Sequence, residues 1–122
     1  MINKNSKIFL AGHNGMIGSA IFRKLKDLNY DNIFTVSKKK IDLTDQKKVS
    51  NYLRKIKPDA VILAAAKVGG IKANNEQKAD FIFENISIQN NVINSSYQNG
   101  VKNLIFLGSS CVYPKKAKIQ IK

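Results

Sequence analysis

Three glycines at regular spacing near the N-terminus are the first candidates for chemistry. They occur in Gly12-His13-Asn14-Gly15-Met16-Ile17-Gly18, a G-x-x-G-x-x-G pattern. Between a strand and a helix, the first glycine permits a tight turn, the second lets the backbone approach a pyrophosphate, and the third allows close helix–strand packing. The helix N-terminus then offers N–H groups and a favourable dipole to the anion. We expect this whole segment to bind a dinucleotide; the alternative is a purely structural turn.

A lysine run bears on which dinucleotide is bound. A site for NAD usually carries Asp or Glu after the second strand, to hold the ribose 2′-hydroxyl, whereas a basic residue suits a 2′-phosphate. This chain has Ser37-Lys38-Lys39-Lys40 there and no acid before Asp42. We therefore predict NADP(H) as the cofactor, with Lys38 contacting the phosphate and Asp42 and Leu43 beside the adenine. The alternative for any single lysine is a solvated side chain in a lysine-rich protein.

Two further segments could line the same site. Ala64, Ala65 and Ala66 follow an apolar run, where small side chains would let the backbone come close to a cofactor, although they also suit ordinary core packing. In the segment from Leu107 to Pro114, extended geometry places Ser109 and Cys111 on one face and Ser110 on the other. A hydroxyl and a thiol side by side suit proton transfer on a carbonyl-bearing sugar. The alternative is a turn serine with a small buried cysteine.

The elements that would position these residues alternate along the chain. Strands are expected at Lys7–Ala11, Ile33–Val36, Ala60–Ala65 and Asn103–Gly108, and helices from Met16 to about Leu28, from an N-cap at Thr44 to Ile56, and from Lys78 to Asn99. Such a βαβαβαβ order predicts an α/β, Rossmann-like parallel sheet of four strands with right-handed crossovers. Ligands bind beyond the carboxyl ends of such strands, here at Gly12, Ser37, Ala66 and Ser109.

Apolar residues at helical spacing predict which helix faces are buried. The first helix carries a stripe of Ile17, Ala20, Ile21, Leu25 and Leu28. The long third helix has a broad face made of Phe81, Ile82, Asn85, Ile88, Gln89, Val92, Ile93 and Tyr97.

Composition limits the class of protein. The 122 residues suit one compact domain over 1–122, and an apolar share of 43% is enough for a core. The net charge of +13 is spread along the chain rather than gathered on one helix, and Arg23 and Arg54 are the only arginines, so we do not expect a nucleic-acid partner. One cysteine and one histidine make a metal site improbable. No membrane partner is expected, and the polar start of the chain suggests a cytoplasmic location.

The chain resembles the N-terminal part of the GDP-L-fucose synthases, which are extended short-chain dehydrogenase/reductases. The glycine segment alone would indicate only the superfamily. The more specific matches are Leu63-Ala64-Ala65-Ala66-Lys67-Val68-Gly69-Gly70-Ile71, Ala73-Asn74-Asn75 and Leu107-Gly108-Ser109-Ser110-Cys111-Val112-Tyr113-Pro114-Lys115.

The resemblance implies a two-part reaction on GDP-4-keto-6-deoxy-D-mannose, with NADPH as the cofactor. The sugar is epimerised at C3 and C5, and its C4 ketone is then reduced. By this resemblance, Ser109 hydrogen-bonds the keto oxygen and Cys111 acts as the acid/base of epimerisation, while Leu107, Gly108 and Ser110 contact the cofactor. His13 matches a phosphate-loop position rather than a catalytic one. Members of the family form homodimers.

The chain also departs from that family. A Tyr-x-x-x-Lys pair is expected on a helix beyond Lys122, and Tyr113 does not replace it because residue 117 is alanine. By the same resemblance, we expect the family's sugar-nucleotide-binding domain to be absent from these 122 residues as well. We therefore expect weak NADPH binding and negligible turnover by the chain alone, an exposed fourth strand, and an uncovered apolar face on the long helix.

Three readings remain at this point. The chain is the front part of a GDP-L-fucose synthase-like enzyme, a non-catalytic dinucleotide-binding module, or a basic nucleic-acid binder that uses the same fold. Within the enzyme class, another sugar-nucleotide epimerase or dehydratase is the second choice. We favour them in the order given.

Overall fold

A parallel β-sheet forms the middle layer of the computed structural model, which describes residues 2–69 and 76–108. Within those ranges the strands run in the order β2-β1-β3-β4 and all neighbouring pairs are parallel. The elements are β1 (Ile8–Ala11), α1 (Met16–Asp27), β2 (Ile33–Thr35), α2 (Gln46–Ile56), β3 (Ala60–Leu63), α4 (Lys78–Gln98) and β4 (Asn103–Phe106). The predicted α/β, Rossmann-like architecture is confirmed.

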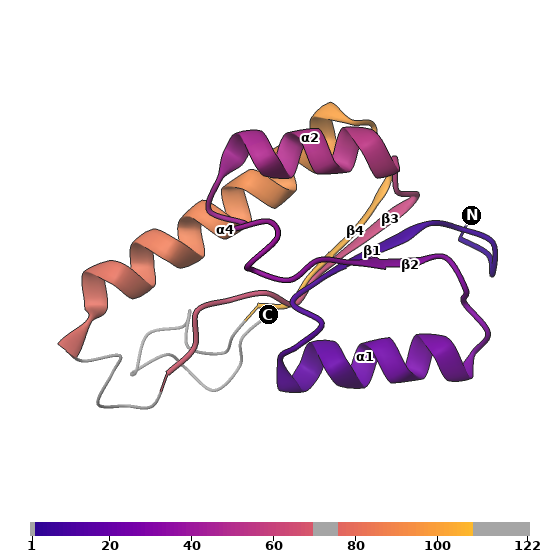
Figure 1. Cartoon of the computed structure of the whole chain (residues 1–122), viewed down its shortest axis with the longest axis horizontal. Helices are drawn as coiled ribbons and strands as arrows, with labels where there is room; N and C mark the ends of the chain where they lie inside the picture. Colours follow the sequence, from indigo (N-terminus) through magenta and orange to yellow (C-terminus); the bar gives the residue numbers. More distant parts are fainter. Residues whose placement is uncertain (1, 70–75, 109–122) are drawn as a thin grey trace, which may run out of the picture.

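The helices cover the two faces of the sheet unequally. Helix α1 lies on one face, and α2 and α4 lie together on the other (Figure 1). Right-handed crossovers explain this arrangement. The step from β1 to β2 runs in the opposite direction to the steps from β2 to β3 and from β3 to β4, so its helix passes over the opposite face.

The core lies between the sheet and the α2–α4 layer. Phe9 and Val61 from the sheet, Leu53 from α2 and Val92 from α4 are all fully buried. The Phe9 ring packs edge-on against Tyr52, with 5.4 Å between ring centroids. Strands β1 and β3 consist entirely of apolar residues, as expected for the central strands of a parallel sheet with helices on both faces.

Strand register brings the carboxyl ends of the central strands to one edge. Ala11 pairs with Leu63, and Leu63 pairs with Phe106. The ladder continues one residue past each strand, because the Ala64 amide donates to the Ala11 carbonyl at 2.9 Å. Strands β2, β3 and β4 each end before the predicted boundary, which leaves Val36, Ala64 to Ala66, Leu107 and Gly108 in the loops that follow.

The predicted N-cap of α2 is wrong by one residue. Asp45, rather than Thr44, caps this helix, and its carboxylate accepts from the Lys48 amide at 3.0 Å. Thr44 instead donates from both its amide and its hydroxyl to Asp42.

The predicted burial of two helix faces is only partly correct. On α1, Ile21 and Leu25 are partly buried, but Ile17, Ala20 and Leu28 are exposed, because α1 is the one described helix on its face of the sheet. On α4, the buried residues are Phe81, Ile88, Val92, Ser95 and Ser96. Ile82, Ile93 and Tyr97 face solvent, so the broad face predicted for this helix is narrower than expected.

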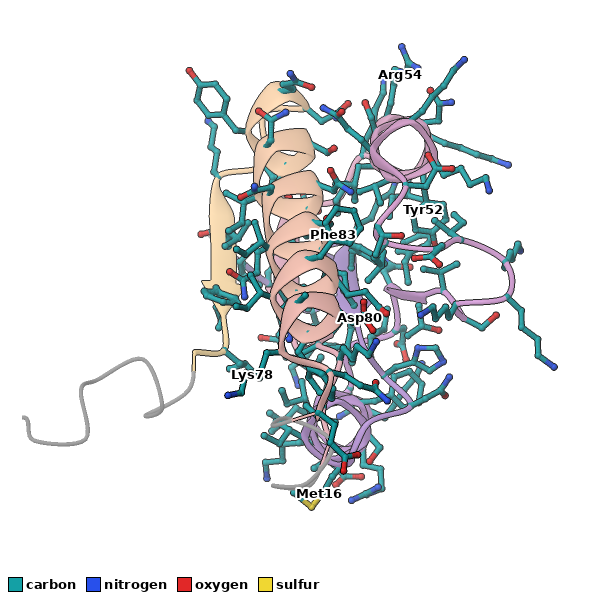
Figure 2. All side chains as sticks on the ribbon, turned by 90° about the vertical axis from the view of Figure 1, so that its left-hand side faces the viewer. Met16, Tyr52, Arg54, Lys78, Asp80 and Phe83 are labelled. Carbon is teal, nitrogen blue, oxygen red and sulfur yellow. The ribbon has the colours of Figure 1, made fainter. Side chains whose placement is uncertain are left out.

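Apolar surface remains uncovered on β4 and on α4, as expected from the sequence. Strand β4 lies at the edge of the sheet, and Ile105 and Phe106 on it are 56% and 42% exposed. On α4, Ile82 and Phe83 are 61% and 70% exposed. Seen from the side, α4 lies between β4 and α2 (Figure 2). A helix of membrane-spanning length and apolarity does not occur in the described part of the chain.

Candidate functional site

A cavity of about 450 Å³ opens at the carboxyl ends of β1 and β3. Its size is typical of small-molecule sites. The glycine turn, the loop after β2, the loop after β3 and one side of α4 all contribute to its wall. The lining residues are Gly12, His13, Asn14, Gly15, Val36, Lys38, Ile41, Asp42, Leu43, Ala64, Ala65, Ala66, Lys67, Glu84 and Ile88.

The glycine turn closes through two contacts that a side chain would prevent. Gly12 has φ +92°, a conformation that glycine adopts without strain, and a Cβ there would lie 2.6 Å from the Ala64 carbonyl carbon. A Cβ on Gly18 would lie 2.0 Å from the Gly12 carbonyl oxygen. Gly12 thus lets the turn pass against the end of β3, and Gly18 lets α1 pack directly on the turn.

The N-terminus of α1 faces this turn without a side-chain cap. Gly15 occupies the N-cap position, no side chain accepts from the first-turn amides, and the first turn carries no acid. Its first N–H groups are therefore available to an external acceptor, and the helix dipole favours an anion there. Met16 begins the helix and projects into solvent, 86% exposed (Figure 2).

The Asp42 carboxylate lies in the cavity wall, where hydrogen bonds hold it in place. Its Oδ1 accepts from the Thr44 amide at 2.9 Å and from the Thr44 hydroxyl at 2.8 Å. The hydrogen bond from the Thr44 amide lowers the pKa of Asp42 below its ordinary value of 3.8, and the nearby Lys38 and Lys48 charges lower it further. Asp42 is therefore an anion at neutral pH and can only accept hydrogen bonds.

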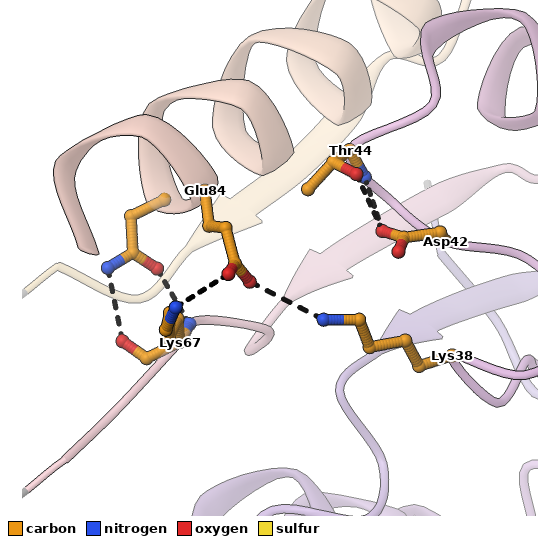
Figure 3. A network of polar contacts seen from close by, with 6 residues as sticks. Lys38, Asp42, Thr44, Lys67 and Glu84 are labelled. Atoms are coloured by element: carbon orange, nitrogen blue, oxygen red, sulfur yellow. Dashed lines mark hydrogen bonds and ion pairs between the residues drawn. The ribbon is translucent and has the colours of Figure 1, made fainter. Parts of the chain in front are cut away.

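Glu84 of α4 joins two lysines from different loops across the cavity (Figure 3). Its Oε1 lies 2.6 Å from Lys67 Nζ, and its Oε2 lies 3.4 Å from Lys38 Nζ. The hydrogen bond from Lys67, followed by the interaction with Lys38, lowers the pKa of Glu84. This wall of the cavity thus holds two cations and one anion, with a net charge of +1 from the three groups.

Lys67 is held by α4 at three points. The Asn85 side chain accepts from the Lys67 amide at 2.7 Å and donates to the Lys67 carbonyl at 3.1 Å. The Lys67 ammonium pairs with Glu84 and also lies 5.2 Å from the centre of the Phe81 ring. The loop after β3 is therefore fixed against α4 at this residue.

Most residues expected at the site surround the cavity. The described structure brings together Gly12, His13, Asn14, Gly15, Lys38, Asp42, Leu43, Ala64, Ala65 and Ala66. Met16, Ile17, Gly18, Leu107 and Gly108 are described but do not belong to its lining. Ser109, Ser110 and Cys111 lie outside the described residues.

Sequence reasoning missed five lining residues: Val36, Ile41, Lys67, Glu84 and Ile88. The signal for Lys67 was present, because it lies in the Ala-Lys-Val-Gly-Gly stretch that carried the family resemblance. Val36, Ile41 and Ile88 look like ordinary core residues in the sequence. Glu84 gives no signal of its own, because its contact with Lys38 depends on how α4 crosses the sheet.

The residues present fit a phosphorylated dinucleotide. The turn is built so closely that a Cβ at Gly12 or Gly18 would collide with backbone, while Gly15 is open toward the cavity except for an ordinary contact with the Gly12 carbonyl. Lys38 and Lys67 line the same cavity, as do the apolar residues Ile41 and Leu43.

The sequence profile of the NAD dependent epimerase/dehydratase family matches residues 8–122. The chain belongs to this family. Its similarity to GDP-L-fucose synthases, expected from the motifs, is confirmed. It is 55% identical over 117 residues to GDP-L-fucose synthase 1 of Arabidopsis thaliana, covering 96% of this chain and 36% of that protein. It is 46% identical over 112 residues to GDP-L-fucose synthase of Escherichia coli, covering 92% and 35%.

Solved structures of the family share the same fold. A GDP-mannoheptose C4 reductase from Campylobacter jejuni with NADP bound superposes with a TM-score of 0.94 at 41% identity, covering 100% of this chain and 38% of that one. The chain thus spans little more than a third of the length of the epimerase/dehydratase relatives that it matches.

Proposed function

We propose that this chain supplies the NADPH-binding part of a GDP-L-fucose synthase-type enzyme, which converts GDP-4-keto-6-deoxy-D-mannose into GDP-L-fucose. The observation that carries the proposal is the cavity itself. An uncapped helix N-terminus behind a glycine turn and the Lys38 ammonium both border the same cavity of about 450 Å³. A relative bound to NADP has the same fold at 41% identity.

Each end of the cavity would take a different part of the cofactor. The backbone amides of the first turn of α1, including Met16 and Ile17, would donate to the pyrophosphate. The Gly15 amide instead closes the turn, because it donates to the Gly12 carbonyl at 3.1 Å. Lys38 would bind the 2′-phosphate. Asp42 and Leu43 would border the adenine, and the backbone beside Ala64 to Ala66 would face the nicotinamide half.

The reaction needs groups that approach the sugar from the cofactor side. NADPH would supply the hydride that reduces the C4 ketone. Ser109 would donate a hydrogen bond to the keto oxygen, which stabilises the developing negative charge. Cys111 would exchange a proton at the epimerised carbons, because a thiol pKa can be tuned toward neutrality. Both roles are inferred from the resemblance of the Leu107 to Pro114 segment to the family.

A chimera tests this proposal directly. The chain replaces the matching segment of the Escherichia coli GDP-L-fucose synthase, to which it is 46% identical. With NADPH and GDP-4-keto-6-deoxy-D-mannose, we expect GDP-L-fucose to form. The matched chimera carrying Cys111→Ser should bind NADPH as well but lose epimerisation. A folded chimera that binds NADPH and forms no GDP-L-fucose would contradict the proposed activity.

Three alternatives have distinct signatures, two in the same assay and one in a DNA-binding assay. If the chain belongs to a GDP-sugar C4 reductase, like the Campylobacter jejuni relative, the chimera reduces the ketone without epimerising the sugar. If the chain is a non-catalytic module, it binds NADPH, and the chimera catalyses neither the epimerisation nor the reduction. A nucleic-acid binder would show salt-dependent binding to DNA that NADPH does not displace.

A further inference from the structure

Glu84 is a second carboxylate, besides Asp42, in a cavity whose glycine turn and lysines suit an anionic ligand. It comes from α4 rather than from the end of β2, where NAD sites usually carry their acid. Its side chain is only 26% exposed, and both of its oxygens are directed at cavity lysines (Figure 3). A half-buried anion among phosphate-binding groups calls for a physical reason, because it weakens the field that a phosphate would experience.

The two ion pairs of Glu84 are unequal. The pair with Lys67 is short, at 2.6 Å, and both side chains are 26% exposed. Lys67 is further held by Asn85 and by the Phe81 ring. The pair with Lys38 is longer, at 3.4 Å, and the Lys38 side chain is 72% exposed. Of the two lysines, Lys38 is thus the one that can leave Glu84 at low cost.

We propose that Glu84 is a specificity-determining residue that competes with the ligand 2′-phosphate for Lys38. This inference rests on the proposed NADPH-binding function. In the free protein, Lys38 is paired with Glu84. A 2′-phosphate, with more charge and more acceptor oxygens than a carboxylate, draws Lys38 away, while Glu84 keeps its pair with Lys67. A dinucleotide without that phosphate leaves the pair intact. Glu84 therefore lowers the preference for NADP+ over NAD+ that Lys38 provides.

The test measures the dissociation constants for NAD+ and NADP+ by calorimetry on the full chain. The ratio used below is the constant for NAD+ divided by the constant for NADP+, so a higher ratio means a stronger preference for NADP+. Glu84→Gln keeps the shape and a hydrogen-bond acceptor for Lys67 but removes the charge. We expect it to tighten NADP+ binding about threefold to tenfold, with about a twofold change or less for NAD+. Lys38→Gln should lower the ratio. In the double variant Glu84→Gln/Lys38→Gln, the effect of Glu84→Gln on the ratio should vanish.

Matched controls separate local pairing from net charge. Asp80→Asn removes one negative charge from α4, and Lys39→Gln removes one positive charge from the lysine run; neither residue lines the cavity. Both should leave the ratio within about twofold. Circular dichroism confirms that each variant is folded, and Lys38→Gln, at an exposed side chain, tests the same pair without altering α4.

The two proposals fail in different ways. If the wild-type chain, folded, binds neither dinucleotide, the proposed function is overturned and the inference with it. If the wild type prefers NADP+ and Lys38→Gln abolishes that preference, but Glu84→Gln leaves the ratio unchanged, the inference alone is overturned. An increase in the ratio with Glu84→Gln that persists in the double variant also overturns it, because Lys38 would then not be the residue competed for.

Discussion

At the scale of single residues, the Asp42 carboxylate shows how local hydrogen bonds set the chemistry of the cavity wall. The Thr44 amide and hydroxyl both donate to it, and the amide is the main reason that its pKa lies below 3.8. Because the folded-state pKa is the lower one, the unfolded chain binds this proton first as the pH falls. The stabilisation is complete well above pH 3.8 and is lost as the pH falls through the folded-state pKa.

This sign leads to a prediction for acid unfolding. Asp42→Asn should lose less stability than the wild type when the pH is lowered from 7 to about 3, because its amide does not titrate. Thr44→Val, which keeps the amide donor but removes the hydroxyl, should behave between the two. Urea unfolding at a series of pH values measures this. If the free energy of unfolding falls equally with pH in the wild type and in Asp42→Asn, then protonation of Asp42 does not contribute to acid unfolding.

A second residue-scale prediction concerns the glycine turn. Gly12 and Gly100 both have positive φ, but only Gly12 has backbone within reach of an added Cβ. Gly100→Ala should cost about 1–2 kcal/mol, the cost of the left-handed conformation. Gly12→Ala should cost about 1–3 kcal/mol more, because of its collision with Ala64. Urea unfolding of both variants gives the difference, and equal losses would mean that the close approach to Ala64 is not tight.

Residue types alone predicted the cavity wall formed by the glycine turn and the lysine run, but not the wall formed by α4. In the glycine turn and the lysine run, the residues that matter are close together in the sequence, so Gly12, Gly15 and Lys38 could be found from it. Glu84 could not, since it is 46 residues from Lys38 and meets it only through the crossover of α4. The predicted role of Thr44 was wrong because two neighbouring residues can both cap a helix, and here Asp45 occupies the N-cap position of α2.

At the scale of elements, α4 serves both the core and the site. Phe81, Ile88 and Val92 anchor it on the sheet, while Glu84 and Asn85 reach the loop after β3. The amphipathic spacing predicted that this helix exists and nearly where it ends. Which apolar residues are buried depended on what lies beside it: α2 and the sheet cover one side, and Ile82 and Tyr97 fall outside that contact.

The two hydrogen bonds between the Asn85 side chain and the Lys67 backbone, here called the Asn85 clamp, lead to a prediction at the scale of elements. Asn85→Ala removes both hydrogen bonds to the Lys67 backbone and leaves its partly buried N–H and C=O groups without them, which should cost about 1–3 kcal/mol. The exposed Asn90 on the same helix provides the control, because Asn90→Ala should change stability by no more than about 0.5 kcal/mol. Urea unfolding measures both. Similar small losses at the two positions would show that the loop after β3 does not depend on the clamp.

At the scale of the whole molecule, uncovered apolar surface predicts self-association. Ile82 and Phe83 on α4 and Ile105 on β4 are each more than half exposed. We expect the chain in solution to form oligomers whose mass rises with concentration. Ile82→Gln/Phe83→Gln should lower that mass, whereas Leu28→Gln, at the end of α1, should not. Sedimentation velocity distinguishes these outcomes, and a wild-type monomer at every concentration would contradict the prediction.

The layered architecture itself was readable from the sequence, because strand and helix patterns alternate without interruption and right-handed crossovers then fix the faces. The uneven cover of the sheet was less accessible. Helical spacing indicates an apolar stripe on α1, but Ile17 and Leu28 are exposed because a single described helix spans that face.

The most direct test of the account is a titration of the ¹⁵N-labelled chain with NADP+, followed by the backbone amide signals. We predict that the largest shifts occur at Met16 and Ile17, with a second group at Lys38 to Asp42 that is much weaker with NAD+. Shifts that avoid the glycine turn, or a folded chain with no shifts at all, would contradict the claim that this turn binds the dinucleotide pyrophosphate.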